Sequence, residues 1–459
     1  MNPPNPVNPV DPVSVLIAGV STRAAAESAA RAGFVVTAID AFGDLDQHPS
    51  VRGLSLAHNF TARAAALAAQ RIECDAVVYL STFENHPNAI TTLAEGRALW
   101  GNPPETVRRV RDPLVLAEAL RARGFATPAV RLPSPSLRPG KPDTTSVNDP
   151  SVTDPSENNM SLNDTSCNNT SVNDTSVKDT SANDTSVNDM NRKSYVESGF
   201  SRTVNQWLVK PLASGGGQRI RFWDRATSLP RGCYLQEFID GPSGSVVFVA
   251  AGGRAVPFGV SRQLVGEPAF GAEGFQYCGN ILTAAPRDNA DNASEFSFLA
   301  AASALAQAVV DEFGLVGVNG IDFIVREGSP CAIEVNPRWC ASMELVERAY
   351  GLSVFGAHAQ ACAAGALPEF DLARARRCAG AIGKAVVFAR RDVVAGDTRA
   401  WLADPSVRDV PHPRERIRAG RPVCTVFAGA RDAASCYNAL VDRAERVYAE
   451  LALWEREVA

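Results

Sequence analysis

A short polar repeat in the middle of the chain divides it into two stretches that can fold. From Ser146 to Asp189 the sequence repeats a five-residue unit, and no aromatic side chain occurs within residues 134–194. The Val, Leu and Ala of each unit are too small and too sparse for the stacked core of a solenoid. Such a segment buries too little apolar surface to offset its ordering entropy. We therefore predict a disordered insert over residues 134–195.

Strands alternating with helices are expected before the insert. The apolar runs that predict strands lie at residues 15–20, 35–40 and 76–80. Their spacing indicates a parallel sheet covered by helices on both faces. Asp112, followed by a proline, begins a further helix that ends at Gly124. We predict one α/β domain with a linker helix over residues 14–133, after a disordered tail at residues 1–13.

After the insert, the sequence predicts long helices, a hairpin and a separate tail. Residues 294–313 carry apolar side chains at helical spacing, and residues 318–336 form a predicted hairpin. The tail from Cys378 contains two strand-like runs and a closing amphipathic helix. We place one domain at residues 196–366 and another at residues 367–459.

The composition excludes several classes of protein. Lys and Arg number 45 against 50 Asp and Glu, a net charge of -5, which does not favour a nucleic-acid partner or a polybasic membrane-surface protein. No run of 18 apolar residues occurs, and the N-terminus lacks a cationic start. The ten cysteines form no Cys-x-x-Cys pair, which favours reduced thiols. These features predict a cytoplasmic protein with no membrane span.

A lysine followed by a glycine run is the first candidate site. Lys210 ends an apolar strand, and a loop of Ser214, Gly215, Gly216 and Gly217 follows before the next strand. Glycines let backbone N–H groups approach phosphate oxygens, and a lysine supplies positive charge. The Gly-Lys-Ser/Thr sequence of a Walker P-loop is absent, and a plain hairpin turn is the alternative for the glycines alone.

The second candidate combines carboxylate, amide and guanidinium side chains on one hairpin. With a turn near Gly328, Asp322 lies across from Glu334, and Asn336 shares the face of Glu334. Two carboxylates and an amide oxygen suit Mg²⁺. Arg338 follows one strand period later and could stabilise a transferring phosphoryl group. A solvated hairpin face is the alternative for either carboxylate alone.

The order and spacing of these motifs resemble the ATP-grasp superfamily. Between the two candidate sites lies an apolar connector, Gln236-Glu237-Phe238-Ile239, which alone would indicate only an edge strand and a turn. The resemblance covers residues 196–366. It implies an α/β and α+β fold in which a parallel α/β pre-ATP-grasp domain precedes a two-subdomain ATP-grasp fold and a closing domain follows.

The resemblance also implies a role for each motif. Lys210 is expected to bind phosphate, the loop 214–217 to cover the phosphates, and residues 236–239 to contact adenine. Lys210 and Arg338 are the expected catalytic residues. The implied ligands for Mg²⁺ or Mn²⁺ are Asp322, Glu334 and Asn336.

Two positions depart from the family pattern. A second phosphate-binding lysine usually follows an aspartate at the start of the first helix, whereas Pro113 follows Asp112 here and Arg111 is the nearest cation. A glutamate usually follows the connector, but this chain continues with Gly241 and Pro242. These departures concern the nucleotide contacts, above all the ribose contact, rather than the metal ligands.

The resemblance predicts an ATP-dependent carboxylate–amine ligase with ATP and Mg²⁺ as cofactors. Its small-molecule partners would be a carboxylate, converted to an acyl phosphate, and an amine that forms the amide and releases ADP and phosphate. Within the superfamily the chain is similar to predicted carboligases of the biotin-carboxylase-like branch. Some relatives of these join glutamate to an amine in one-carbon coenzyme synthesis. A homodimer is left open.

Three other functions are alternatives. A biotin carboxylase using bicarbonate is the nearest, although the four methionines do not flank a biotin-accepting lysine. A non-catalytic ATP-binding regulatory module would explain the missing second lysine. A nicotinamide-dependent oxidoreductase is the weakest alternative, because Gly-x-Gly-x-x-Gly is absent.

Three polar segments at strand ends are weaker candidates. Residues 19–23 follow the first strand, and Arg23 could meet a substrate carboxylate. Residues 83–87 follow the third strand, at the edge where open α/β sheets bind ligands, with a turn as the alternative. Residues 261–263 could line an acceptor pocket or simply end a strand.

Overall fold

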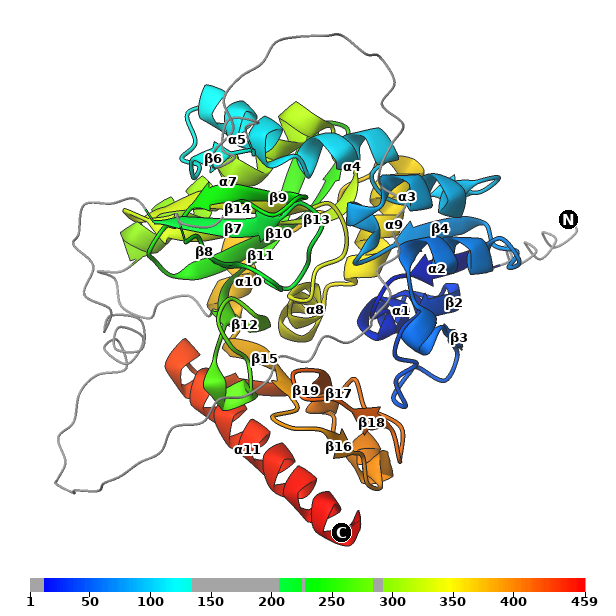
Figure 1. Ribbon diagram of the computed structural model, residues 1–459. Helices are drawn as coiled ribbons and strands as arrows, with labels where there is room; N and C mark the ends of the chain where they lie inside the picture. Colours follow the sequence, from blue (N-terminus) through cyan, green and yellow to red (C-terminus); the bar gives the residue numbers. More distant parts are fainter. Residues whose placement is uncertain (1–11, 134–205, 225–227, 284–291, 459) are drawn as a thin grey trace, which may run out of the picture. The chain divides into compact units, whose positions relative to one another are not determined.

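Four sheets organise the part of the chain that this computed structural model describes, namely residues 12–133, 206–224, 228–283 and 292–458 (Figure 1). The predicted disorder of residues 134–195 lies outside these ranges, as does that of the tail up to residue 11. All the described residues belong to one compact unit. The domain boundaries within that unit stay predictions.

A five-stranded parallel sheet forms the N-terminal part, as the alternating pattern predicts. Its elements are β1 (Ser14–Ala18), α1 (Arg23–Arg31), β2 (Val35–Asp40), β3 (Arg52–Ser55), η1 (Ala57–Asn59), α2 (Ala62–Ala69), β4 (Ala76–Tyr79), η2 (Phe83–Asn85), α3 (Pro87–Ala94), β5 (Ala98–Leu99) and α4 (Pro104–Val110). The strand order is β3-β2-β1-β4-β5. Buried aliphatic side chains of the central strands pack against helices on both faces.

The linker helix leads into a four-stranded sheet. Its elements are α5 (Pro113–Ala122), β6 (Val130–Arg131), β7 (Trp207–Pro211), β8 (Arg221–Phe222) and β9 (Cys233–Glu237), with the strand order β6-β9-β7-β8. Asp112 caps α5 by accepting hydrogen bonds from the backbone N–H groups of Leu114 (2.9 Å) and Val115 (3.2 Å). The connector strand β9 lies between two partners, so the edge position that its sequence alone indicates is wrong.

An eight-stranded sheet runs across the predicted boundary at residues 366 and 367. Its strands are β10 (Ser243–Ala251), β11 (Arg254–Val265), β12 (Tyr277–Leu282), β13 (Gly317–Arg326), β14 (Ser329–Asn336), β15 (Ala381–Phe388), β17 (Val407–Arg408) and β19 (Pro422–Ala430). The order is β14-β13-β10-β11-β12-β15-β19-β17. Because β12 pairs with β15, the tail extends the sheet of the preceding domain.

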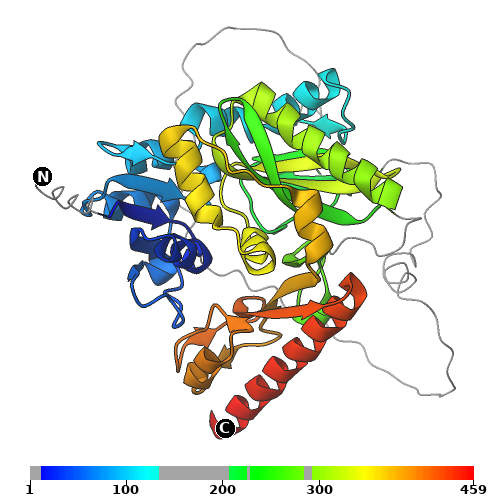
Figure 2. The ribbon, with the colours of Figure 1, turned by 180° about the vertical axis from the view of Figure 1, so that it is seen from behind.

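Helices cover both faces of this large sheet (Figure 2). The remaining elements are η4 (Pro268–Phe270), α7 (Asn292–Phe313), α8 (Met343–Tyr350), α9 (Val354–Ala364), α10 (Leu372–Cys378), β16 (Val393–Val394), η5 (Thr398–Ala403), β18 (Arg416–Ile417) and α11 (Ala433–Val458). One hydrophobic core joins α7 to β10, β11 and β13, and another joins α8 and α9 to the opposite face and to the N-terminal sheet. The long helix α11 packs on β15 and β19.

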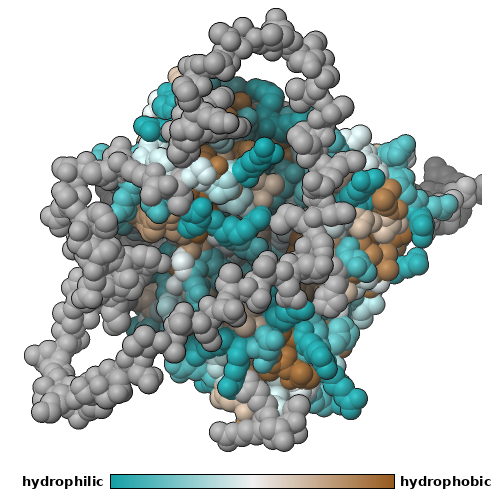
Figure 3. Space-filling view, in the orientation of Figure 1, coloured by the Kyte–Doolittle hydropathy of each residue, from teal (hydrophilic) through white to brown (hydrophobic). Residues whose placement is uncertain are grey.

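Within the described residues, no helix has both the length and the apolar character needed to cross a bilayer. On the face drawn in Figure 3, hydrophobic residues form separate patches among hydrophilic ones. The predicted site residues lie where the hairpin, the small sheet and the N-terminal sheet meet.

Candidate functional site

The hairpin of β13 and β14 brings the two predicted carboxylates together. A turn of Glu327 and Gly328, with φ values of 52° and 76°, joins the strands. Asp322 is the register partner of Glu334, as the spacing predicts, and a β-bulge follows directly at Phe323. The two side chains therefore share one face of the sheet.

Two amide side chains hold the Asp322 carboxylate. Nε2 of Gln263 donates to Oδ1 (2.8 Å), and Nδ2 of Asn336 donates to Oδ2 (2.9 Å). Burial and the charge of Glu334 raise the pKa of Asp322 to about 7, although the Asn336 hydrogen bond and the charge of Arg338 lower it. A cation bound here would relieve this repulsion. This donor set of two carboxylates and an amide fits a hard, oxygen-binding ion such as Mg²⁺.

Arg111 lies beside Glu334, near the position of the missing lysine. Its Nη1 donates to Oε1 of Glu334 and to the carbonyl oxygen of Val335 (3.1 Å). Its Nη2 donates to Oδ1 of Asn85 (3.1 Å) and to the carbonyl oxygen of Ser214 (3.5 Å). Burial raises the pKa of Glu334, but the charge of Arg111 and of other cations outweighs burial and holds this pKa below its ordinary value.

Arg338 points from the hairpin to the N-terminal sheet. Its Nε donates to Oε1 of Glu84 (2.7 Å), and its Nη2 lies 2.6 Å from the same oxygen. Nη1 donates to the carbonyl oxygen of Trp339 (2.9 Å), and Nη2 to Oδ1 of Asn336 (3.3 Å). Burial lowers the pKa of Arg338, but the charge of Glu84 outweighs it and the pKa lies well above its ordinary value.

Lys210 is buried on β7 and connects the small sheet to the hairpin. Its Nζ donates to Oε1 of Gln236 on β9 (3.0 Å). Nε2 of Gln236 in turn donates to the carbonyl oxygen of Ile333 on β14 (3.4 Å). Against the effect of burial, the charge of Lys210 lowers the pKa of both Asp322 and Glu334, so the lysine acts on the carboxylate pair.

The other connector residues have contacts of their own. Oε2 of Glu237 accepts a hydrogen bond from the backbone N–H of Ala129 (3.0 Å). The ring of Phe238 meets the ring of Phe222 edge to face, with centroids 5.1 Å apart, and Ile239 is half-buried. The connector is thus an ordered strand end beside Lys210 and Gln236.

The glycine loop lies against the segment that leads into β12. The backbone N–H of Tyr277 donates to the carbonyl oxygen of Gly216 (3.0 Å). Gly217 has a φ of +73°, and a Cβ at this position would lie 1.8 Å from the carbonyl oxygen of Phe275. A Cβ on Gly215, by contrast, would meet nothing within 4 Å. The close approach at Gly217 therefore requires a glycine.

The segment at residues 83–87 belongs to the same site. Glu84 binds the hairpin arginine, and Nδ2 of Asn85 donates to the carbonyl oxygen of Ser214 (3.2 Å) while its Oδ1 accepts from Arg111. Both residues lie in η2, directly after β4. The carboxyl edge of the parallel sheet therefore contacts both the glycine loop and the acidic hairpin.

Residues 261–263 contribute to a polar row across the large sheet. Ser245 is the register partner of both Asp322 and Ser261, and the two serine hydroxyls lie 3.0 Å apart. Nδ2 of Asn280 donates to the hydroxyl of Ser261 (2.9 Å). The row extends the carboxylate pair toward β12 with buried neutral groups.

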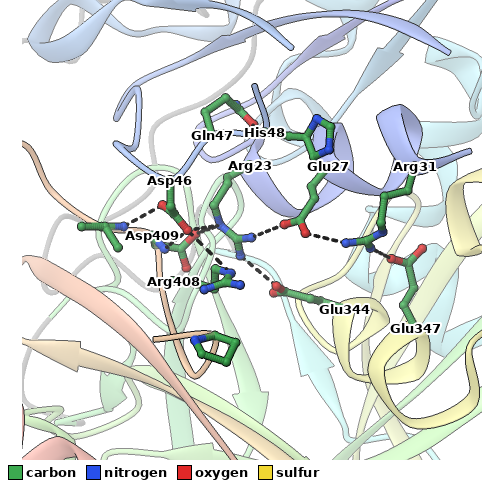
Figure 4. Close-up of polar contacts among 12 residues, drawn as sticks. Arg23, Glu27, Arg31, Asp46, Gln47, His48, Glu344, Glu347, Arg408 and Asp409 are labelled. Atoms are coloured by element: carbon green, nitrogen blue, oxygen red, sulfur yellow. Dashed lines mark hydrogen bonds and ion pairs between the residues drawn. The ribbon is translucent and has the colours of Figure 1, made fainter. Parts of the chain in front are cut away.

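The role considered for Arg23 is not supported, because carboxylates of the protein bind its guanidinium (Figure 4). Arg23 is 0% exposed and donates to Oδ1 of Asp409 (2.6 Å), Oε2 of Glu27 (2.9 Å) and Oε1 of Glu344 (2.9 Å). Nζ of Lys384 donates to the other oxygen of Glu344 (2.8 Å). These residues, named the Arg23 cluster below, fasten α1 to α8, β15 and the loop after β17.

Some contacts of the site had only a weak signal in the sequence. The pairing of Glu84 with Arg338 joins residues 254 positions apart, and polar residues after a buried strand were its only indication. The row through Ser245 and Asn280 had none. In the part of the chain that the structure describes, no group of three or more His, Cys, Asp or Glu is arranged to hold a metal ion, and the predicted metal set has only two carboxylates.

The two linked sheets, with a lysine, a glycine loop and an acidic hairpin between them, define the ATP-grasp class of fold. The family model described as the ATP-grasp domain matches residues 185–342. This chain carries an ATP-grasp domain.

Known proteins similar to this chain are distant in sequence. An uncharacterized protein of Methanocaldococcus jannaschii is 24% identical over 120 residues, which are 26% of this chain and 28% of that protein. The chain thus matches little more than a quarter of the length of this curated relative.

Solved structures match nearly the whole chain. The biotin carboxylase domain of 2-oxoglutarate carboxylase from Hydrogenobacter thermophilus has a TM-score of 0.58 and 13% identity, covering 94% of this chain and 88% of that one. The L-amino acid ligase of Bacillus licheniformis has a TM-score of 0.57 and 14% identity, covering 94% of this chain and 97% of that one. At these identities the similarity shows the fold.

Proposed function

We propose that the protein is an ATP-dependent carboxylate–amine ligase. The observation that carries the proposal is the set of charges around the hairpin: Asp322 faces Glu334, and Lys210, Arg111 and Arg338 surround the pair. Cations around a half-buried carboxylate pair suit a nucleoside triphosphate with its metal.

Each residue of the set has a distinct task in this proposal. Lys210 binds phosphate oxygens, the loop 214–217 covers them through its backbone N–H groups, and residues 236–239 meet the adenine. Asp322, Glu334 and Asn336 would hold Mg²⁺, which would supply charge neutralisation at the phosphates. Arg338 stabilises the charge on the transferring phosphoryl group.

In this proposal, Arg111 supplies the second cation that the family pattern contains and that this chain lacks as a lysine. Its guanidinium already touches Glu334 and the carbonyl oxygen of Ser214, so it lies between the metal ligands and the glycine loop. The activated carboxylate is an acyl phosphate, which an amine converts to an amide with release of ADP and phosphate. Glutamate joined to an amine is the substrate pair that we propose to test first.

The test is ADP release by the purified protein with ATP and Mg²⁺. The twenty amino acids serve as carboxylates, tyramine and the amino acids themselves as amines, and bicarbonate is added separately. ADP release that needs both a carboxylate and an amine is the expected result. ADP release with bicarbonate alone would favour the carboxylase alternative. ATP binding without turnover on every substrate would contradict the ligase and favour a regulatory module.

A further inference from the structure

Glu84 has a carboxylate oxygen for which the protein provides no partner. Its side chain is 1% exposed, and Oε1 receives both contacts from Arg338. Oε2 is also buried, and none of the described residues hydrogen-bonds to it. A buried carboxylate oxygen without a donor is costly. A ligand N–H or a bound water is what such an oxygen requires.

The position of this oxygen connects it to the proposed reaction. Glu84 follows β4 at the carboxyl edge of an open parallel sheet, where ligands bind. It contacts Arg338, and its charge raises the pKa of Arg111 against the effect of burial. The cations of the site suit a phosphorylated carboxylate, whereas Oε2 of Glu84, which has no donor among the described residues, lies on the side of the N-terminal sheet.

We propose that Glu84 binds the ammonium group of the amine substrate through Oε2 and accepts a proton from it. This inference rests on the proposed ligase function. The ammonium passes one proton to Oε2, and the freed lone pair attacks the carbonyl carbon of the acyl phosphate. The C–N bond forms as the C–O bond to phosphate breaks, and phosphate leaves with the bonding electrons and the second proton.

Arg338 couples the two halves of the reaction. Its Nε–H and Nη2–H groups, which contact Oε1 of Glu84, are the donors that a phosphoryl oxygen would also attract. When they turn to the phosphoryl group, Oε1 of Glu84 loses its donor as well, and both oxygens of the buried carboxylate are left for the ammonium group of the amine. Formation of the acyl phosphate therefore prepares Glu84 for the amine.

The test separates the two steps with hydroxylamine. Hydroxylamine is mostly unprotonated at neutral pH and traps an acyl phosphate as a hydroxamate without needing a base. In Glu84→Gln we expect hydroxamate formation from the amino-acid panel within about threefold of wild type, and amide formation with tyramine reduced about 100-fold or more. Raising the pH, which deprotonates tyramine, should restore part of the amide formation. Glu95→Gln, an exposed glutamate of the same domain, is the control and should change neither rate.

The outcomes distinguish this inference from the proposed function. If wild-type protein gives no hydroxamate with any amino acid, the ligase proposal fails and this one fails with it. If Glu84→Gln lowers hydroxamate and amide formation equally, Glu84 only holds Arg338 and the inference is wrong. Should Glu84→Gln not fold, as judged by its thermal transition, Glu84→Asp gives the same comparison, because it keeps a charge opposite Arg338 but withdraws the oxygen.

Discussion

Two groups of charged side chains connect the N-terminal sheet to the rest of the molecule. They differ in how many of their polar atoms have a hydrogen-bond partner within the protein. In the Arg23 cluster, each of the three guanidinium nitrogens donates to a carboxylate, and Lys384 pairs with Glu344 as well. In the candidate site, Oε2 of Glu84 and Nε of Arg111 are buried without a partner among the described residues.

The difference indicates different tasks. Charges that bind one another fully fix the geometry of the chain, since each buried charge needs its partner. Buried charged groups in which a polar atom lacks a hydrogen-bond partner are suited to a ligand that supplies the missing hydrogen bond. Asp44, which lies beside the Arg23 cluster, is an exception, because its buried Oδ2 has no partner among the described residues. Burial and the neighbouring Asp409 raise the pKa of Asp44 well above its ordinary value, which favours the neutral carboxyl.

The largest effect is expected from removing Glu334. Glu334→Ala should lower turnover about 1,000-fold or more, because a lost metal ligand removes several kcal/mol of charge stabilisation. The thermal transition should stay close to that of wild type, since Glu334 contacts Arg111 at a partly open site. Glu327→Ala in the turn of the same hairpin is the matched control. Wild-type turnover in Glu334→Ala would remove the basis of the functional proposal.

In the Arg23 cluster we expect a substitution to lower the stability of the fold, whereas Glu334→Ala lowers turnover and leaves stability nearly unchanged. Arg23→Met should cost about 3–5 kcal/mol of folding free energy, because it leaves several buried carboxylates without their partner. Chemical denaturation measures this loss. Arg399→Met removes an exposed ion pair with Asp397 and should leave the denaturation midpoint unchanged. An Arg23→Met protein as stable as wild type would show that the cluster does not fasten the parts of the chain.

The fold was predictable from sequence where a local pattern of residues was enough to indicate an element or a register. Parallel strands followed from apolar runs at regular spacing, and the hairpin register followed from a turn at Gly328, which places Asp322 opposite Glu334. The continuation of the large sheet into β15 was not predictable, since the pairing of Gly279 with Ala385 has no local signal in the sequence.

The site was predictable only in its local motifs. Lys210, the glycine loop and the hairpin each lie within short segments, so their residues could be named from sequence. The contacts of Arg23 with Asp409 and of Arg338 with Glu84 could not, because these partners lie hundreds of positions away. For the same reason, sequence alone left open whether Arg23 meets a substrate or a carboxylate of the protein.

The two regions should also respond to pH with opposite signs. Burial raises the pKa of Glu344, but Arg23 and Lys384 outweigh it and hold this pKa far below the ordinary value of 4.5. Its stabilisation is therefore present above that pH and is lost as the pH falls below it. Burial and Glu334 raise the pKa of Asp322 from 3.8 to about 7. The folded protein binds a proton there that the unfolded chain releases, so stability falls as the pH rises through this range.

Asp322→Asn tests the loss of folding stability with rising pH that the raised pKa of Asp322 predicts. In the presence of a chelator, the variant should gain stability relative to wild type as the pH rises, by about 2 kcal/mol between about pH 5 and 8. Denaturation curves at several pH values measure the difference. Added Mg²⁺ should stabilise wild type at the upper end of this range and leave Asp322→Asn nearly unchanged. A pH-independent difference between the two proteins would contradict the raised pKa.

The smallest effect is expected in the glycine loop, where Gly215 and Gly217, two positions apart, form a matched pair. Gly217→Ala forces a side chain into the left-handed region, 1.8 Å from the carbonyl oxygen of Phe275, and the loop must move away from the phosphates. We expect the KM for ATP to rise about tenfold, equivalent to about 1.4 kcal/mol. The Cβ that Gly215→Ala adds would meet nothing within 4 Å, so this variant should leave the KM for ATP unchanged. Equal KM values in the two variants would mean that the contact between loop and β12 does not shape the nucleotide site.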